Sequence, residues 1–574
     1  MSTRDRRWSG KLRLADPALK PHRARLVAAV DAGSLPPPPP GHFYLAAGEN
    51  SLFRARARSN RSGTIPLLVL QGPTPAEANR VPASLLLLPL GASQSPDEAA
   101  AVLVDAILKQ QQPFAFDFCG FWRSRDLSCQ SAGETATLGQ DGRCLEEYLS
   151  GKAANLPDHP FWTGAATACA SAGLSETEFV NHVLTLRTVW FSPYTGTPVS
   201  PAEAAGIFAT MQDQWQSNAQ PSHCYGAQYW NHPSIEATFT GTGGGVRFHE
   251  TQAGAIEAAR EDGGRILSWA GRTDTAFEAE CTAREVPLLR IEDGFLRSVG
   301  LGAGLARGAM LAVDDLGIYY DPSRPSRLEK LLNDHDLTEA ERQRGVTLVD
   351  LISRTRVSKY NFGKARRYDF PSGATKILVP GQVADDAAIR KSLSRTIDCA
   401  NTPNVNLDLL RLARERNPGA YLVFKPHPDV ETGLRKGKVS QSEALEYADH
   451  VAADANIIDL IEAVDGVETF SSLSGFEALL RGRRVAVHGA PFYAGWGLCE
   501  DLTPIEGRGR QRTLPELVFL ALVKYAATLD PVTLLPCSPE FLVSRLAAQR
   551  TDRKHLVATA LKRHASWLGR KLGL

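Results

Sequence analysis

Apolar runs and helix-forming stretches alternate regularly after residue 245, and this alternation constrains the fold more than any other feature. Short runs rich in Val, Ile and Leu are followed by stretches with helical periodicity. Because strands joined by helices pair in parallel, this order predicts parallel sheets covered by helices. Two Rossmann-like domains facing one cleft explain it most simply. The expected strands are 265–270, 287–291, 376–379, 421–424, 467–470 and 484–488, and the expected helices are 274–284, 407–416 and 476–481.

The first 245 residues lack this regular alternation. A proline run at 36–40 favours an extended spacer after a basic leader. Apolar runs at 65–70 and 85–88 predict strands, and periodicity at 97–110 predicts a helix. The aromatic-rich stretch 160–238 is interpreted as a helical core and not as a ligand platform. The expected regions are 1–41 (leader and linker), 42–155 (small accessory α/β region), 156–245 (mostly helical region and linker), 246–370 and 371–520 (Rossmann-like domains) and 521–574 (carboxy-terminal helices).

Charge and cysteine content exclude several classes of protein. The chain has 64 basic and 63 acidic residues, so no overall field favours nucleic acid, and no nucleic-acid partner is expected. Nine cysteines without a C-x-x-C pair predict neither a zinc ribbon nor a disulfide framework. No apolar signal segment follows the basic amino terminus, and the apolar run 85–90 is far shorter than the ~20 residues of a membrane span. We therefore expect a cytoplasmic protein.

Two adjacent acids, Glu292 and Asp293, follow the predicted strand 287–291. Open α/β sheets bind ligands at the carboxyl ends of their strands, so either acid could act there as a base. An isolated Asp-Gly pair is more often a solvated or ion-paired loop. The other polar clusters at strand ends favour the functional interpretation.

The segment Lys425-Pro426-His427-Pro428-Asp429 follows the predicted strand 421–424 directly. Its two prolines fix the backbone around the imidazole of His427. A histidine and a lysine at this position can both donate to phosphate oxygens. We therefore predict a phosphate contact here.

Hydroxyl groups gather between the predicted strand 467–470 and the next helix, at Ser471, Ser472 and Ser474. A helix start of this kind binds anions, although simple capping by Ser474 is an equal alternative. The chain has neither a G-x-x-x-x-G-K-[ST] nor a G-x-G-x-x-G motif at this point, which disfavours ATP and NAD.

Two further acids, Asp385 and Asp386, follow Gln382 just after the predicted strand 376–379. One acid could be a nucleophile and the other a helix cap, and capping is the stronger expectation for Asp385. No acid or histidine cluster has H-x-x-x-H or D-x-D spacing, so we expect no metal.

Several long motifs together resemble the KpsC-type capsule β-Kdo transferases, over roughly residues 246–520. This resemblance implies a GT-B glycosyltransferase fold, CMP-β-Kdo as donor without a metal or other cofactor, and retention of the β configuration. The motifs are IEDGFLRSVGLG, VDDLGIYYDPSRPS, SKYNFG, VPGQVADD, FKPHPD, ETFSSLSGFEALLRGRRVAVHG and PFYAGWG.

The resemblance also implies roles for individual residues. Asp386 would be the nucleophile of a double displacement, and Asp293, or with less support Glu292, would take the acceptor proton. His427, with the serine turn at 471–474, would hold the cytidine phosphate. Arg297 and Lys359 are candidates to bind the Kdo carboxylate.

Members of this family carry two transferase modules in tandem, whereas this sequence matches one. His159-Pro160 and His232-Pro233, in the first 245 residues, lack the accompanying acidic motifs and are interpreted as structural. Two other functions stay open: a non-catalytic assembly or export component of capsule synthesis, and a GT-B enzyme that uses UDP-sugars.

The last residues, 553–574, combine helical apolar spacing with six basic side chains. Packing against the fold and contact with an anionic membrane are equal interpretations, and a lipid-linked acceptor favours the membrane. The expected partners are therefore CMP-Kdo, a glycan or lipid-linked acceptor and the inner face of the inner membrane, with other capsule assembly proteins as further candidates.

Overall fold

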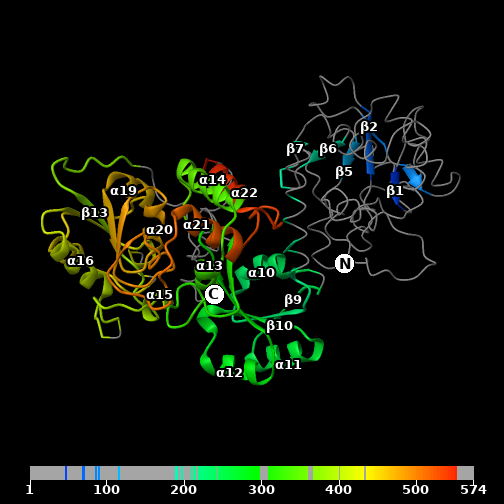
Figure 1. The fold of residues 1–574 in the computed structure, drawn as a ribbon, viewed down its shortest axis with the longest axis horizontal. Coiled ribbons are helices and arrows are strands. Elements are labelled where there is room, and N and C mark those ends of the chain that lie inside the picture. Colours follow the sequence, from blue (N-terminus) through cyan, green and yellow to red (C-terminus); the bar gives the residue numbers. More distant parts are fainter. Residues whose placement is uncertain are drawn as a thin grey trace. The chain divides into compact units, whose positions relative to one another are not determined.

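The chain divides into two compact units between Ser217 and Asn218. A computed structural model describes residues 217–551, except 242, 298–307, 360–365, 400, 432 and 434, and before residue 217 it describes the strands β1 to β7 with a few further residues (Figure 1). The division lies earlier than the expected one at residue 245. The reason is that strand β8 (Ser222–Tyr225) pairs within a sheet of the second unit.

The first unit contains a mixed sheet in the order β4-β1-β2-β5-β6-β7, with β3 on β2. Strand β5 pairs in parallel with β6, so this sheet continues across residue 155, where a boundary was expected. The expected strand at 85–88 is divided into β3 and β4, and the expected helix 97–110 lies outside the described residues, as does His159. The strands are β1 Leu45–Ala47, β2 Leu67–Gln71, β3 Ser84–Leu86, β4 Leu88–Leu90, β5 Phe114–Phe116, β6 Thr188–Phe191 and β7 Pro198–Val199.

The second unit begins with a six-stranded sheet in the order β19-β12-β11-β10-β8-β9. Strands β9, β8, β10 and β11 run in parallel, and β12 and β19 are antiparallel to their neighbours. Strand β19 comes from near the end of the described chain, and no local pattern predicted it. The bounds are β8 Ser222–Tyr225, β9 Val246–His249, β10 Arg265–Trp269, β11 Leu288–Asp293, β12 Met310–Asp314 and β19 Ala526–Thr528.

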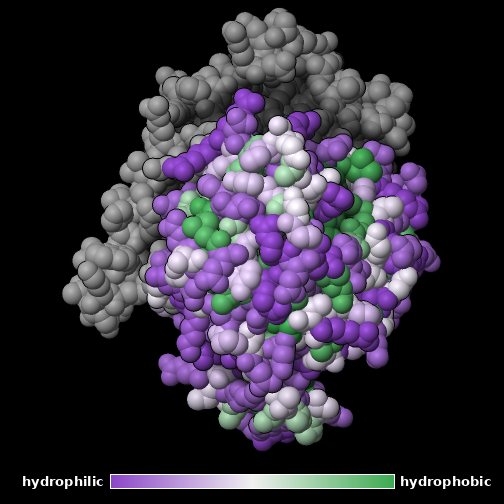
Figure 2. Space-filling view, turned by 90° about the vertical axis from the view of Figure 1, so that its left-hand side faces the viewer, coloured by the Kyte–Doolittle hydropathy of each residue, from purple (hydrophilic) through white to green (hydrophobic). Residues whose placement is uncertain are grey.

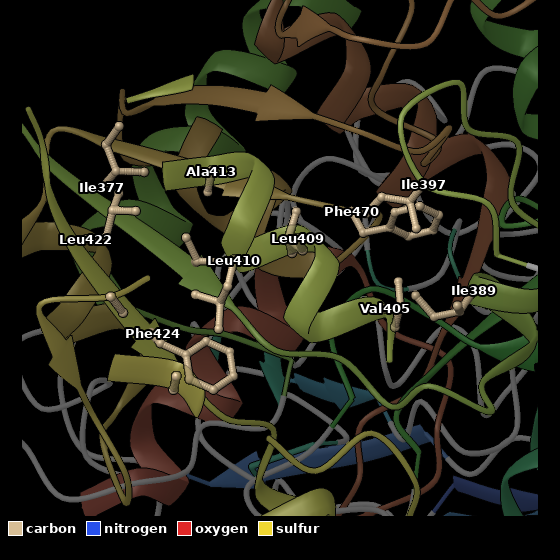
Figure 3. Close-up of a cluster of buried hydrophobic side chains, with 13 residues drawn as sticks. Ile377, Ile389, Ile397, Val405, Leu409, Leu410, Ala413, Leu422, Phe424 and Phe470 are labelled. Atoms are coloured by element: carbon tan, nitrogen blue, oxygen red, sulfur yellow. The ribbon is translucent and has the colours of Figure 1, made fainter. Parts of the chain in front are cut away.

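A second six-stranded sheet, in the order β15-β14-β13-β16-β17-β18, is parallel throughout. Helices cover such a sheet on both faces, so its central strands are continuous apolar runs. Figure 3 shows the core between β13, β14 and helix α16, where Leu409, Leu410 and Phe424 are buried. The two parallel-rich sheets confirm the expected α/β class. The bounds are β13 Lys376–Pro380, β14 Tyr421–Lys425, β15 His450–Val451, β16 Gly466–Thr469, β17 Arg484–Val487 and β18 Glu500–Asp501.

Local capping fixes several of the helices. Asp274 caps α12 at the position expected for its start, and Thr338 and Glu341 form a capping box for α14. Helix α14 packs closely on α21 because Gly345 has no Cβ. A Cβ at this position would lie 2.3 Å from the carbonyl oxygen of Pro515. The helices are α10 His232–Phe239, α11 Gln252–Asp262, α12 Thr275–Ala283, α13 Arg327–Asp334, α14 Glu339–Thr355, α15 Ala387–Arg390, α16 Val405–Arg416, α17 Pro428–Glu431, α18 Gln441–Leu445, α19 Ile457–Ala463, α20 Leu473–Leu479, α21 Leu514–Phe519, a π-helix Leu520–Tyr525 and α22 Pro539–Thr551.

The aromatic stretch before β9 is partly exposed. Tyr229 was expected in a helical core, but 68% of it is exposed, because it lies in a short 3-10 helix after β8. His232 stacks on Phe248 with ring centroids 3.8 Å apart, and its Nε2 lies 3.1 Å from the carbonyl oxygen of Ala227. The structural interpretation of His232-Pro233 is therefore confirmed.

The face of the second unit drawn in Figure 2 is mostly hydrophilic, with small separate hydrophobic areas. Within the part of the chain that the structure describes, no helix has the length and hydrophobicity needed to cross a bilayer. The predicted basic helix at 553–574 lies outside the described residues.

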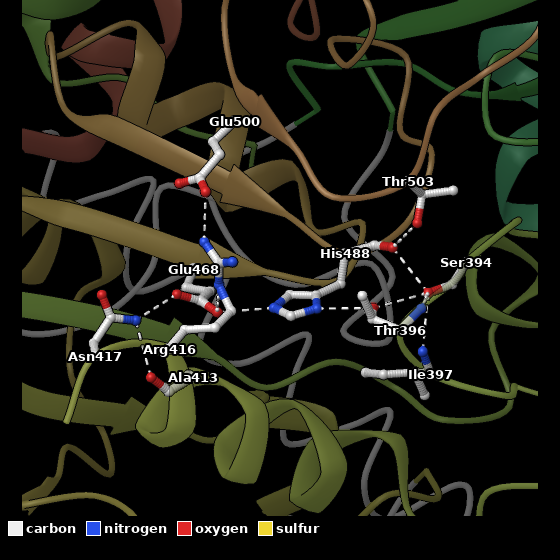
Figure 4. Close-up of polar contacts among 10 residues, drawn as sticks. All are labelled: Ser394, Thr396, Ile397, Ala413, Arg416, Asn417, Glu468, His488, Glu500 and Thr503. Carbon is white, nitrogen blue, oxygen red and sulfur yellow. Dashed lines mark hydrogen bonds and ion pairs between the residues drawn. The ribbon is translucent and has the colours of Figure 1, made fainter.

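A buried polar network joins β16, β17 and α16 (Figure 4). Glu468 is 2% exposed, and its Oε1 lies 2.8 Å from Nε2 of His488. The same oxygen accepts from Nε of Arg416 at 3.0 Å, and Oε2 accepts from Nδ2 of Asn417 at 2.8 Å. Thr396 lies 2.9 Å from the other imidazole nitrogen, so the network ties the loop after α15 to the sheet.

Replacing Glu468 by glutamine is expected to lower the free energy of unfolding by about 1–3 kcal/mol. The new amide group would face donors from Arg416 and Asn417 and leave a buried donor without an acceptor. Urea unfolding of this variant and of Glu446→Gln measures the effect, since Glu446 is exposed and its replacement should change stability by less than about 0.5 kcal/mol. Equal stabilities of the two variants would contradict a stabilising role of the network.

Candidate active site

The carboxyl ends of strands from both sheets of the second unit open onto one cavity of about 500 Å³. This is the position at which open α/β sheets bind ligands. Of the residues for which the family resemblance or the strand-end motifs predicted a catalytic or substrate-binding role, all line the cavity except Arg297 and the alternative acid Asp385. Those that line it are Glu292, Asp293, Lys359, Gln382, Asp386, Lys425, His427, Ser471, Ser472 and Ser474.

The two acids at the end of β11 have different surroundings. Oδ2 of Asp293 lies 2.7 Å from Nε of the buried Arg297, so this carboxylate is already ion-paired. Burial, and then the charge of Asp293, raise the pKa of Glu292 to about 8. A carboxyl group with such a pKa can exchange a proton near neutral pH, which suits an acid or a base.

The helix-capping role expected for Asp385 belongs to Asp386 in the structure. Asp386, and not Asp385, caps helix α15, with Oδ1 3.5 Å from the backbone nitrogen of Ala388. The reason is that Asp385 turns to Arg435 and forms an ion pair of 3.2 Å. Of the two acids, it is Asp386 that lines the cavity. The candidate nucleophile therefore also fixes the start of α15.

His427 is held as a hydrogen-bond donor. Its Nδ1 accepts from the backbone N–H of Asp429 at 3.2 Å, so the proton of a neutral ring lies on Nε2. Burial lowers the pKa of His427, and it also lowers the pKa of Lys425, which is 6% exposed. A bound phosphate would favour the protonated forms of both groups, and Nε2–H can donate to it in either form.

The serine turn is organised by Gln382. Its Oε1 accepts from the backbone N–H of Ser471 at 2.9 Å, and its Nε2 lies 3.3 Å from Oγ of the same serine. Ser472, and not the expected Ser474, caps α20, so the helix begins at Leu473, three residues before the expected start. Gln382 thus fixes the turn at the end of β16 against the end of β13.

Several cavity residues were not selected from the sequence. Tyr319 donates from its hydroxyl to the carbonyl oxygen of Asp293 at 3.2 Å, and Tyr320 lines the cavity beside it. Glu477 accepts from the backbone N–H of Lys359 at 3.0 Å. The two tyrosines lie inside a quoted motif, which was a usable signal. Arg435 has no local signal, because its partner Asp385 is 50 residues away.

In the described parts of the chain, no three His, Cys, Asp or Glu side chains are placed to share a metal ion. The polar side chains that line the cavity include the carboxylates of Glu292, Asp293 and Asp386 and the possible hydrogen-bond donors Lys425 and His427. This arrangement suits transfer of a group from a phosphate ester through an acidic side chain.

Two solved structures resemble part of this chain. Thermosulfurimonas dismutans KpsC, beta Kdo 2,7 transferase, is 30% identical with a TM-score of 0.46, and the match covers 58% of this chain and 100% of that chain. Thermosulfurimonas dismutans KpsC, beta Kdo 2,4 transferase, is 31% identical with a TM-score of 0.48, and the match covers 57% and 98%.

Two sequence relatives have names that refer to capsule polysaccharide or lipopolysaccharide. The capsule polysaccharide modification protein LipA of Neisseria meningitidis serogroup A is 36% identical over 64% of this chain and 51% of its own length. The lipopolysaccharide-processing protein LpsZ of Rhizobium meliloti is 42% identical over 42% of this chain and 54% of its own length. The chain thus spans about half the length of these relatives. Residues 265–530 match the family described as "Capsule polysaccharide biosynthesis protein".

Proposed function

We propose that this protein is a retaining glycosyltransferase of capsule polysaccharide biosynthesis with a GT-B fold, which moves β-Kdo from CMP-β-Kdo to a glycan or lipid-linked acceptor. One observation carries the proposal: Glu292, Asp386 and His427, from three strand ends in two sheets, line the same cavity. The donor is inferred from the motif resemblance described above, and the family description supports the capsule context.

In the first step, the Asp386 carboxylate attacks the anomeric carbon of Kdo, and the bond from that carbon to the CMP phosphate breaks. The electron pair of that bond leaves with the phosphate. Nε2–H of His427 and the ammonium group of Lys425, which line the same cavity, would stabilise its charge. The product is CMP and a Kdo ester of Asp386, with inversion at the anomeric carbon.

In the second step, an acceptor hydroxyl attacks the same carbon and releases the Asp386 carboxylate, which restores the β configuration. We assign its proton to Glu292 in preference to Asp293, because Asp293 is already ion-paired with Arg297. The charge of Asp386 contributes to the raised pKa of Glu292. Forming the ester removes that charge, so Glu292 loses its proton more readily at the stage at which a base is needed.

Each alternative predicts a different experimental outcome. A non-catalytic assembly component would bind no nucleotide sugar productively, and a UDP-sugar enzyme would prefer uridine nucleotides. Transfer assays with CMP-β-Kdo and with UDP-sugars on a glycolipid acceptor test the function directly. We also propose contact with an anionic membrane and with other capsule assembly proteins. A lipid-linked acceptor would require the membrane contact.

CMP is expected to raise the melting temperature of the protein, whereas UDP is not, because nucleotide binding stabilises only the folded state. His427→Ala should weaken CMP binding by about 1–3 kcal/mol, the range for loss of a charge-assisted hydrogen bond. Titration calorimetry measures this change, and His450→Ala on β15 is the control outside the cavity. A shift with UDP alone would overturn the donor, and unchanged CMP affinity in His427→Ala would return this residue to a structural role.

A further inference from the structure

The hydroxyl group of Tyr320 is buried and unsatisfied. Its oxygen is shielded from bulk solvent and has no hydrogen-bond partner among the described residues. Native structures retain few such groups, because a buried donor without an acceptor destabilises the fold. Tyr320 also lines the cavity, so a bound ligand could supply the missing acceptor.

Neighbouring tyrosines do not share this property. The hydroxyl of Tyr319 donates to the carbonyl oxygen of Asp293, and that of Tyr525 donates to Oδ2 of Asp314 at 2.9 Å. Tyr493, which also lines the cavity, donates to the carbonyl oxygen of Ser472. Unsatisfied hydroxyl groups are therefore not general in this region.

Contacts of the Tyr320 ring and of the next residue, Asp321, fix the position of Tyr320. The Tyr320 ring packs edge-on against Tyr319, with centroids 5.3 Å apart and an interplanar angle of 85°. Oδ2 of the buried Asp321 forms an ion pair of 2.9 Å with Lys391, the residue after helix α15. Because Asp386 caps α15, this ion pair connects the residue after Tyr320 to the helix that the proposed nucleophile caps.

The surroundings of Tyr320 keep its hydroxyl protonated. Burial raises the pKa of Tyr320, and the charges of Glu292 and Asp386 raise it further. The hydroxyl is therefore a neutral donor, and its natural acceptor is an anionic group. In a 2-keto-acid sugar, a carboxylate is attached to the anomeric carbon itself, next to the bond that breaks. Arg297, the cation expected to bind it, is paired with Asp293 and does not line the cavity.

We propose that the Tyr320 hydroxyl binds the transferred sugar by donating a hydrogen bond to the carboxylate beside its anomeric carbon. This proposal rests on the proposed function and names a specificity-determining residue of its donor site. Lys359, which also lines the cavity, faces the same region and adds a positive charge. Together they offset the repulsion between the sugar carboxylate and the attacking Asp386.

The test compares Tyr320→Phe with Tyr368→Phe in the full-length protein. The hydroxyl of Tyr368 is also without a partner among the described residues, but Tyr368 stacks on Phe370 away from the cavity. Each substitution removes only an oxygen. We expect Tyr320→Phe to keep its CMP affinity, to melt at or above the wild-type temperature, and to lose about 10–100-fold in kcat/KM with CMP-β-Kdo, the range for a hydrogen bond to a charged group. Tyr368→Phe should match the wild type.

A second measurement reads the contact without turnover. Binding of 2-deoxy-β-Kdo and of its C1 amide, both in the presence of CMP, forms a double-mutant cycle with the two protein variants. The wild type should prefer the acid, and Tyr320→Phe should lose about tenfold of that preference. An equal loss of affinity for acid and amide, or wild-type kcat/KM in Tyr320→Phe, would overturn the assignment while the transferase function stands. If the wild type neither transfers Kdo nor binds the acid, the proposed function itself fails and this assignment fails with it.

Discussion

Replacing Asp386 by asparagine is expected to lower Kdo transfer by at least about 10³-fold while CMP binding is retained. Asparagine keeps an oxygen that can cap α15, so the local fold should persist. It lacks the carboxylate that forms the covalent bond to the sugar. The proposed phosphate donors Lys425 and His427 lie at the end of β14 and should be unaffected. Steady-state transfer rates and calorimetric titration with CMP measure the two effects separately.

The neighbouring acid supplies the matched control. Asp385→Asn breaks the ion pair with Arg435 but leaves the cavity acids in place, so it should keep most of the activity. Mass spectrometry of wild-type protein treated with CMP-β-Kdo should locate a Kdo adduct on Asp386. An adduct on Asp385, or full activity of Asp386→Asn, would exclude this mechanism.

Replacing Glu292 by glutamine is expected to slow transfer to the acceptor by about 10²–10⁴-fold, the usual contribution of a general base. The first step needs no base at this position, so the Kdo ester of Asp386 should accumulate in the variant. Quenched-flow mass spectrometry follows both species. Asp293→Asn is the discriminating comparison, since Asp293 is the alternative base. Loss of the second step in that variant, with normal turnover in Glu292→Gln, would reverse the assignment.

The same variant should change two pH profiles. Glu292 must be ionised to accept a proton, so wild-type transfer should rise with pH up to about 8, and this limb should be absent in Glu292→Gln. Folding raises this pKa from 4.5, so the folded state holds the proton more tightly. The resulting stability is complete below about pH 4.5 and is lost as the pH rises through about 8. Urea unfolding across that range should therefore be less pH-dependent in the variant.

Local sequence patterns were sufficient to predict most of the second unit. The runs that became β10, β13, β14 and β17 are apolar on both faces, which a parallel sheet under helices requires, and their limits agree with the predicted ones to within one residue. Once a strand is located, the residues after it lie at its carboxyl end. For that reason Glu292, Asp386 and His427 could be placed at the carboxyl ends of strands from the sequence, and the cavity brings them together.

Contacts between distant residues decided what the sequence left open. Arg297 pairs with Asp293 and leaves Glu292 as the acid with the raised pKa. Arg435 draws Asp385 away and leaves Asp386 to cap α15, and Ser472 caps α20 in place of Ser474. Strand β19 pairs with β12, which lies more than 200 residues earlier in the chain. Periodicity and turn residues are local properties, so the sequence by itself determined the strands, most helices and the strand ends at which the site forms. Burial and ion pairing depend on which remote side chains meet, so only the tertiary structure decided which acid pairs, which one caps a helix, and that the Tyr320 hydroxyl has no partner among the described residues.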